Sequence, residues 1–272
     1  MLVGSVTPTP SRIPRLRISN VRVLLVSRAS MSASRAIVGV TLPIYLSTLG
    51  YSATQMGEIF AAVAIGSALL STMVGTYADR FGRKPFLVLF PLLTALAALT
   101  CVQTDRTGYV VAACILGSFG RGGGAGGGNV GPYMPAEQAL LTASAPETAR
   151  TKNFGRLAFT SSFGALIGGL IAAATVSGHL TRGDAEAVFR LSFLATGVTA
   201  FVAGALGFLL KEPARPKFAS SEERKTARGG FFPRNSAGLV YRLWLTNALN
   251  GAAIGLFAPF VSYWLFRRYG AS

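Results

Sequence analysis

Arginine side chains inside apolar stretches are the groups of this sequence with the clearest capacity for chemistry. Arg35 lies about 12 residues into the first long apolar segment, which places it about 18 Å along a helix. Arg121 lies at a similar depth in a later segment that runs the opposite way. A charge held in such surroundings usually serves a function, so both residues are candidates to bind an anionic ligand or a carboxylate. The structural alternative is that they pair with backbone carbonyls, or with Glu58, and fix helix packing.

Two further ionisable residues lie nearer the ends of these segments. Arg28 precedes Arg35 by two helical turns, and its long side chain is expected to extend toward the membrane surface. Glu137 is expected near the same surface. Neither residue is predicted to take part in a solute site.

A turn between the second and third apolar segments combines glycines with charged residues. It holds, in order, Gly75, Asp79, Arg80, Gly82, Arg83 and Lys84. The two glycines permit a close helix approach and a tight reversal. The carboxylate can bind basic groups or a helix N-terminus, and breaking that contact favours one conformation over another. One interpretation is a turn whose contacts change with conformation; the alternative is that the positive charges only anchor the chain at the membrane surface.

Other kinds of chemistry lack the residues that they need. His179 is the only histidine, and Cys101 and Cys114 both lie in apolar runs, so the sequence offers no metal-ligand cluster. The glycines at 122–128 lack the Gly-Lys-Ser/Thr ending of a phosphate-binding loop. We therefore expect no cofactor, no metal and no enzyme activity.

The amino-acid composition indicates which class of protein holds these residues in place. Of 272 residues, 51% are apolar and 13% are charged, whereas soluble domains carry about 25% charged residues. A soluble protein of this length would need more charge to cover its surface. The sequence therefore predicts a protein whose surface faces the lipid bilayer.

Seven apolar segments of bilayer-spanning length follow one another along the chain. They are predicted at about Val23–Leu49, Gln55–Tyr77, Phe86–Val102, a fourth that starts near Tyr109 and continues through the glycine-rich stretch, Leu157–Val176, Phe189–Leu210 and Leu239–Phe266. After the first segment, Gly50 marks a turn, and Ser52 with Gln55 predicts a capping box for the second.

Basic residues are distributed unevenly between the two sides of this predicted membrane protein. With the N-terminus in the cytoplasm, eighteen Lys and Arg residues of the loops lie on the cytoplasmic side and five on the other side. Cytoplasmic loops carry such an excess. The sequence therefore predicts a multi-pass protein of the cell (inner) membrane with a cytoplasmic N-terminus. The same asymmetry explains the net charge of +16 without a nucleic-acid partner.

The turn from Gly75 to Lys84 resembles the signature of the major facilitator superfamily, Gly-x-x-x-Asp-Arg-x-Gly-Arg-Lys/Arg, which lies in its second-to-third cytoplasmic loop. Arg121 followed by small residues, and the run from Pro135 to Arg150, are similar to the fourth segment of family members and the loop after it. The resemblance implies secondary active transport of a small solute by alternating access, with a coupled ion or proton as a further partner. It also implies that the turn from Gly75 to Lys84 is a conformational gate and that the segments carrying Arg35 and Arg121 line the transport path. The direction of transport and the coupling ion stay open.

The fifth segment is similar to the antiporter motif of that family, Gly-Pro-x-x-Gly-Gly. It carries Gly164, Gly168 and Gly169, but Ala165 replaces the proline. The spacing of four between the first two glycines predicts a close helix-packing face. The kink that proline would supply is not expected.

The resemblance implies an all-α membrane protein, with a major facilitator-like six-helix bundle plus a seventh transmembrane helix, since the family has two six-helix halves. We expect a cytoplasmic tail at 1–20, the bundle at 21–210, a cytoplasmic linker at 211–237 and, at 238–272, the seventh helix as the start of a truncated second half. Such a fragment is expected to be inactive alone. The alternative is a non-transporting seven-span membrane protein or sensor.

Overall fold

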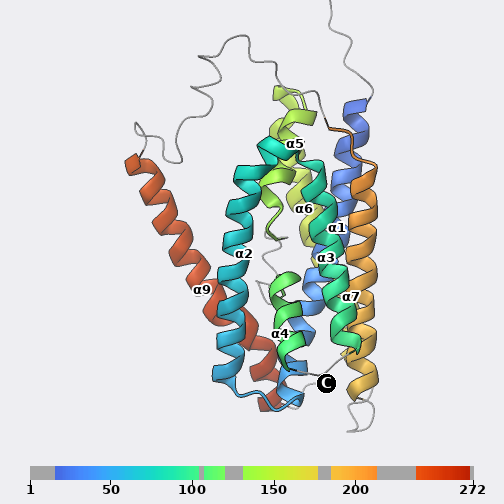
Figure 1. Ribbon diagram of the computed structural model, residues 1–272, viewed down its shortest axis with the longest axis vertical. Helices are drawn as coiled ribbons and strands as arrows, with labels where there is room; N and C mark the ends of the chain where they lie inside the picture. Colours follow the sequence, from blue (N-terminus) through green and yellow to red (C-terminus); the bar gives the residue numbers. More distant parts are fainter. Residues whose placement is uncertain (1–15, 104–106, 120–130, 177–184, 213–236, 270–272) are drawn as a thin grey trace, which may run out of the picture.

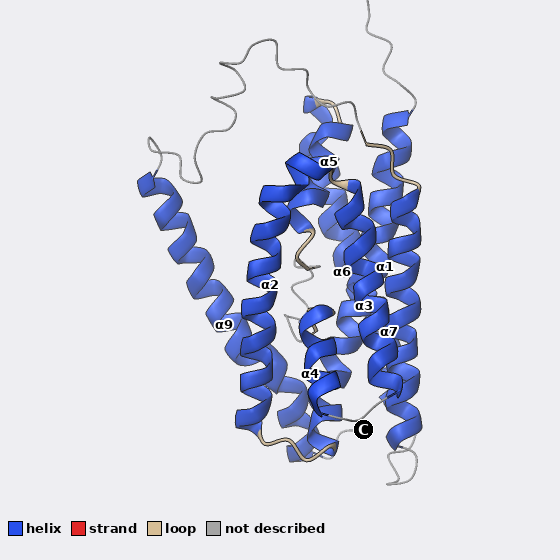
Figure 2. Cartoon of the chain, viewed as in Figure 1, coloured by secondary structure: helices blue, strands red, loops and turns tan. Residues whose placement is uncertain are grey.

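The computed structural model describes residues 16–103, 107–119, 131–176, 185–212 and 237–269, and all its long elements are helices (Figures 1 and 2). They are α1 Leu16–Thr48, α2 Ala53–Phe81, α3 Lys84–Gln103, α4 Thr107–Leu116, α5 Met134–Ser144, the 3₁₀ turn η1 Glu147–Ala149, α6 Arg150–Val176, α7 Ala185–Phe208 and α9 Ala237–Tyr269.

Five spans in the described part of the chain, in α1, α2, α3, α6 and α7, are long and apolar enough to cross a membrane. Their outward faces carry large apolar side chains. Phe159 of α6 is 71% exposed, and Leu69 of α2 and Val198 of α7 are similarly open. Such surfaces are stable against lipid and not against water. The prediction of an all-α membrane fold is confirmed.

Helix α1 lies at the centre of the arrangement. It packs along α6 and α7, while α3 packs along α7, and α2 contacts both α4 and α5 (Figure 1). The first turn after α1 has the predicted form. Ser52 N–H donates to Gln55 Oε1 at 2.9 Å, and Gln55 N–H donates to Ser52 Oγ at 3.3 Å. The predicted capping box at the start of α2 is therefore confirmed.

The fourth apolar segment is interrupted. Helix α4 ends at Leu116, and the predicted continuation of this segment through the glycine-rich stretch at 122–128 lies outside the described residues. Ser118 has a φ of 51°, and Phe119 N–H donates to the Cys114 carbonyl at 2.8 Å, which closes the helix terminus. A second helix, α5, starts afresh at Met134 with a proline in its first turn. The glycines that follow α4 are poor helix formers, which explains why the first helix does not propagate.

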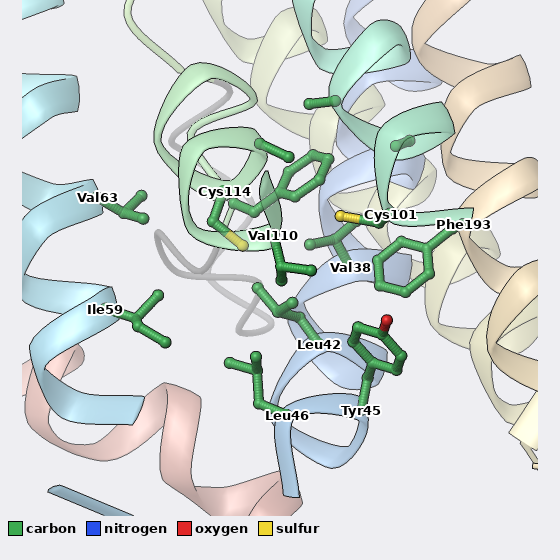
Figure 3. Packing of buried hydrophobic residues seen from close by; sticks show 14 of the residues in the cluster. Val38, Leu42, Tyr45, Leu46, Ile59, Val63, Cys101, Val110, Cys114 and Phe193 are labelled. Atoms are coloured by element: carbon green, nitrogen blue, oxygen red, sulfur yellow. The ribbon is translucent and has the colours of Figure 1, made fainter. Parts of the chain in front are cut away.

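Apolar side chains fill the bundle in two clusters. The first surrounds the C-terminal half of α1, and part of it is shown in Figure 3; there Tyr45 meets Phe193 edge to face at a centroid distance of 5.2 Å. Cys101 and Cys114 are both free and buried in this cluster. The second cluster lies around the other half of α1. It includes Leu24, Met31, Val74, Leu87, Tyr133, Leu140, Leu157 and Ala203.

Helix α9 runs obliquely away from the other helices at one end (Figure 1). At the other end it touches α2, where the rings of Phe60 and Phe260 lie 6.2 Å apart, centroid to centroid. Elsewhere it exposes large apolar side chains such as Leu249 and Phe257. Helix α1 begins at Leu16, inside the predicted tail, and most of the predicted linker lies outside the described residues.

Candidate functional site

Helix α1 presents two buried arginines to the interrupted fourth segment. Arg28 and Arg35 are seven residues apart, so they lie nearly two turns apart on one face of the helix. Both side chains are buried. They contact different halves of the fourth segment, Arg28 on α5 and Arg35 at the end of α4.

Arg28 forms an ion pair with Glu137, in the first turn of α5. Arg28 Nη1 and Glu137 Oε2 lie 3.2 Å apart, and the two side chains are only 4% and 2% exposed. The expectation that Arg28 extends to the membrane surface is wrong. The physical reason is the acidic partner: an arginine next to a carboxylate keeps its charge inside the bundle, so it has no need to reach water. The sequence showed both residues but not their adjacency.

Arg35 is held by backbone groups. Its Nη1 donates to the carbonyl of Ser118, just past the last turn of α4. The C-terminus of a helix carries partial negative charge, which favours a cation there. Gly131 lies on the other side of the guanidinium with a φ of +125°, and a Cβ at this position would come within 2.5 Å of Arg35 Nη2. Only glycine fits beside this arginine. Arg121, the second predicted cavity residue, lies outside the described residues.

The predicted gate loop is tied to the end of α7. Arg83 N–H donates to Glu212 Oε1 at 2.9 Å, and Lys84 Nζ donates to the Phe208 carbonyl at 2.8 Å. Gly82 has a φ of +101°, and a Cβ there would lie 2.6 Å from Glu212 Oε2. The turn therefore needs glycine for its backbone angle and for the space that the carboxylate occupies.

The same loop also reaches α5, since Arg83 Nη1 donates to the Ala139 carbonyl at 2.8 Å. Arg80 is exposed and lies over the adjacent Phe81 ring, 5.9 Å from its centroid. Asp79 belongs to the last turn of α2. Apart from the chain neighbours of Gly75 and the backbone of its own helix, no heavy atom of the described residues would lie within 4 Å of a Cβ on Gly75. The described residues therefore show no close helix approach at this glycine.

The glycines of α6 divide into two kinds. A Cβ on Gly164 would lie 2.8 Å from Ala29 Cα, and one on Gly168 would lie 2.7 Å from Ala33 Cα, so α6 and α1 approach backbone to backbone. A Cβ on Gly169 would have no such neighbour within 4 Å in the described part of the chain. The predicted helix-packing face therefore contains Gly164 and Gly168 but not Gly169.

Comparison with known families decides what this bundle is. The model of the Major Facilitator Superfamily matches residues 24–272. The chain belongs to the Major Facilitator Superfamily. Its transporters are multi-pass membrane proteins that move small solutes.

Two relatives of this major facilitator chain come from Staphylococcus aureus. Quinolone resistance protein NorA is 25% identical over 168 residues, which are 62% of this chain and 37% of NorA. The Staphyloferrin B transporter is 28% identical over 166 residues, which are 58% of this chain and 37% of the relative. The matched part thus spans well under half the length of either relative.

Sequence reasoning missed two acidic residues of this major facilitator chain. Glu137 was expected at a membrane surface and not as the partner of Arg28. Glu212 follows the sixth predicted segment without a predicted role, and its carboxylate accepts from the Arg83 N–H. The sequence did hold a signal for the first: an acid within an otherwise apolar run requires a basic partner.

Proposed function

We propose that this protein moves a small solute across the cell membrane by alternating access, as a secondary active transporter. One observation carries the proposal beyond family membership. The bundle is apolar outside, yet it turns Arg28 and Arg35 inward toward an interrupted helix. Interrupted helices and buried charges of this kind are where transporters bind solutes and ions.

We assign Arg35, together with Arg121, to the solute path. Guanidinium groups bind planar anions in a bidentate manner, so the pair favours an anionic or polar solute over a cation. The contact of Arg35 with the Ser118 carbonyl supports the packing role equally well. The roles of Arg35 in solute binding and in helix packing are compatible. A solute that replaces the Ser118 carbonyl as the partner of Arg35 displaces a neutral group and not a charged one.

We assign the turn from Gly75 to Lys84 to conformational gating on the cytoplasmic side. Its Arg83 and Lys84 are anchored on α5 and on the end of α7, so the turn is a rigid part of this bundle. We assign to Asp79 and Arg80 the contacts that form in one conformation and break in another. The positive-inside distribution of the loops supports a cytoplasmic N-terminus, which puts this turn in the cytoplasm.

The relatives suggest which solutes to test. Their names refer to quinolones and to staphyloferrin B. A quinolone, staphyloferrin B and a small organic anion are therefore the probes for uptake into liposomes that contain this chain joined to a second six-helix half, since this chain alone is expected to show no uptake.

Asp79→Asn tests the gate in this assay. The charge of Asp79 is expected to stabilise one of the two conformations by about 1–3 kcal/mol, the size of a hydrogen bond to a charged group. The variant should therefore transport several-fold more slowly while it accumulates in the membrane like the wild type. Arg156→Gln, an exposed change at the start of α6, serves as the control.

Absence of saturable uptake for all three probes would contradict transport, and unchanged turnover in Asp79→Asn would contradict the gate.

A further inference from the structure

Three polar side chains meet between α1 and α5: Arg28, Tyr133 and Glu137. All are at least nine-tenths buried. Arg28 Nη1 and Glu137 Oε2 are close enough for an ion pair but not aligned as a hydrogen bond. Within the described part of the chain, neither of these atoms has a hydrogen-bond partner, and the same holds for Arg28 Nε and Tyr133 Oη. The cluster therefore keeps unused donors and acceptors at its centre.

The surroundings of this cluster are apolar. Helices α2, α3, α6 and α7 contribute Val74, Leu87, Leu157 and Ala203 to the same region. The ionisable groups near Glu137 among the described residues are Arg28 from α1 and Tyr133, the residue before α5, with Arg35 near Tyr133. Within the described part of the chain, Glu137 thus has one compensating charge, and its Oε2 has no hydrogen bond.

Such an acid has two balanced forms. Burial disfavours its charged form, whereas the adjacent guanidinium stabilises it. Addition of a proton from water to a Glu137 oxygen removes the negative charge and creates an O–H donor. Tyr133 is the residue before α5 and lies four residues before Glu137, so we expect its hydroxyl oxygen to accept from that O–H. Arg28 then loses its electrostatic partner, and α1 loses its ion pair with α5.

We propose that Glu137 is a proton-binding site, paired with Arg28 when charged and bonded to Tyr133 when protonated. Proton binding would release α1 from α5, and Arg28 would become available to another anion. That this proton is the coupling ion of transport rests on the proposed function. The binding of the proton itself does not.

Infrared spectroscopy of the 272-residue chain in lipid vesicles tests the site without any solute. As pH falls, a carbonyl-stretch band of a protonated carboxylic acid should rise and be absent in Glu137→Gln. Arg28→Met should move the midpoint of this band to higher pH by about 1–3 units, because a nearby opposite charge shifts a carboxyl by that amount. Arg28→Lys keeps the charge and should leave the midpoint near that of the wild type.

A control and a second variant keep the test decisive. Glu147→Gln changes an exposed acid that pairs with Arg150 and should leave the band in place. If Glu137→Gln does not fold, Glu137→Asp keeps an acid and should shift the frequency of the band. A band insensitive to both changes at Glu137, or a midpoint insensitive to Arg28→Met, would overturn the proposal. A titrating Glu137 in a protein without uptake would count against the proposed function alone.

Discussion

Arg28 and Arg35 are the same residue type on the same face of α1, yet the bundle compensates them in different ways. Arg28 faces a full negative charge on Glu137 at 3.2 Å. Arg35 faces the neutral carbonyl of Ser118, at a helix C-terminus that carries only partial charge. The ion pair of Arg28 and Glu137 joins two helices through two charges that compensate each other. The contact of Arg35 uses a backbone carbonyl, which side-chain substitutions do not remove.

The difference shows how each site responds to change. Loss of one member of a buried ion pair leaves an uncompensated charge in a low-dielectric interior, which costs more than the pair contributes. Loss of Arg35 removes the partner of the neutral Ser118 carbonyl. We therefore expect the Arg28 site to be sensitive to mutation and protonation, and the Arg35 site to be comparatively robust.

The largest expected effect comes from breaking the ion pair on one side. Glu137→Leu should lower the free energy of unfolding by about 3–5 kcal/mol, because it leaves the Arg28 charge buried alone. The double variant Arg28→Met with Glu137→Leu should recover most of this loss. Denaturant unfolding in detergent micelles, followed by circular dichroism, measures both. Equal losses in the single and double variants would mean that the charge of Arg28 is compensated by something other than Glu137.

Removal of the second arginine should cost less. Arg35→Met deletes a hydrogen bond from a charged donor, so the free energy of unfolding should fall by about 1.5–3 kcal/mol. The same unfolding experiment measures the change. A loss larger than that of Glu137→Leu would reverse the proposed ranking of the two sites.

The contact between α1 and α6 sharpens the comparison, because it fixes the rotation of α1 and thereby the direction of both arginines. Gly168→Val places a branched side chain against the backbone of Ala33 and should cost about 1–3 kcal/mol by overpacking. Gly169→Val, on the next residue, meets no such neighbour and should be close to neutral. Equal losses at 168 and 169 would show that α6 does not lie on α1 as the structure has it.

The smallest effect is expected at the exposed ion pair of Glu147 and Arg150, whose side chains are 88% and 43% exposed. Exposed pairs contribute about 0–1 kcal/mol, so Glu147→Ala should change the free energy of unfolding by less than that limit. Comparison with Glu137→Leu then isolates the effect of burial, because both ion pairs join an arginine to a glutamate. A loss of several kcal/mol at Glu147 would remove burial as the explanation.

Local sequence predicted much of the fold. The apolar runs predicted the positions of most helices to within several residues, since a span requires a minimum length of apolar side chains. Ser52 and Gln55 predicted their own capping box, because both partners lie within one turn. The turn from Gly75 to Lys84 indicated the superfamily to which the chain belongs.

Other features depended on contacts between distant parts of the chain. The apolar pattern gave no sign that α4 would end at Leu116, because hydropathy does not record whether a helix continues. Glu212 meets Arg83 only because α7 returns beside the start of α3. Neither outcome is encoded in a local pattern of residues.

The sequence by itself thus determined that charged groups lie within the apolar helices of this membrane protein and at which position along its helix each of them stands. Only the tertiary structure decided which groups meet. Depth follows from the rise of a helix along one segment. The identity of a partner depends on how two helices are rotated toward each other, and that rotation is set by packing, such as the approach of Gly164 and Gly168 to α1.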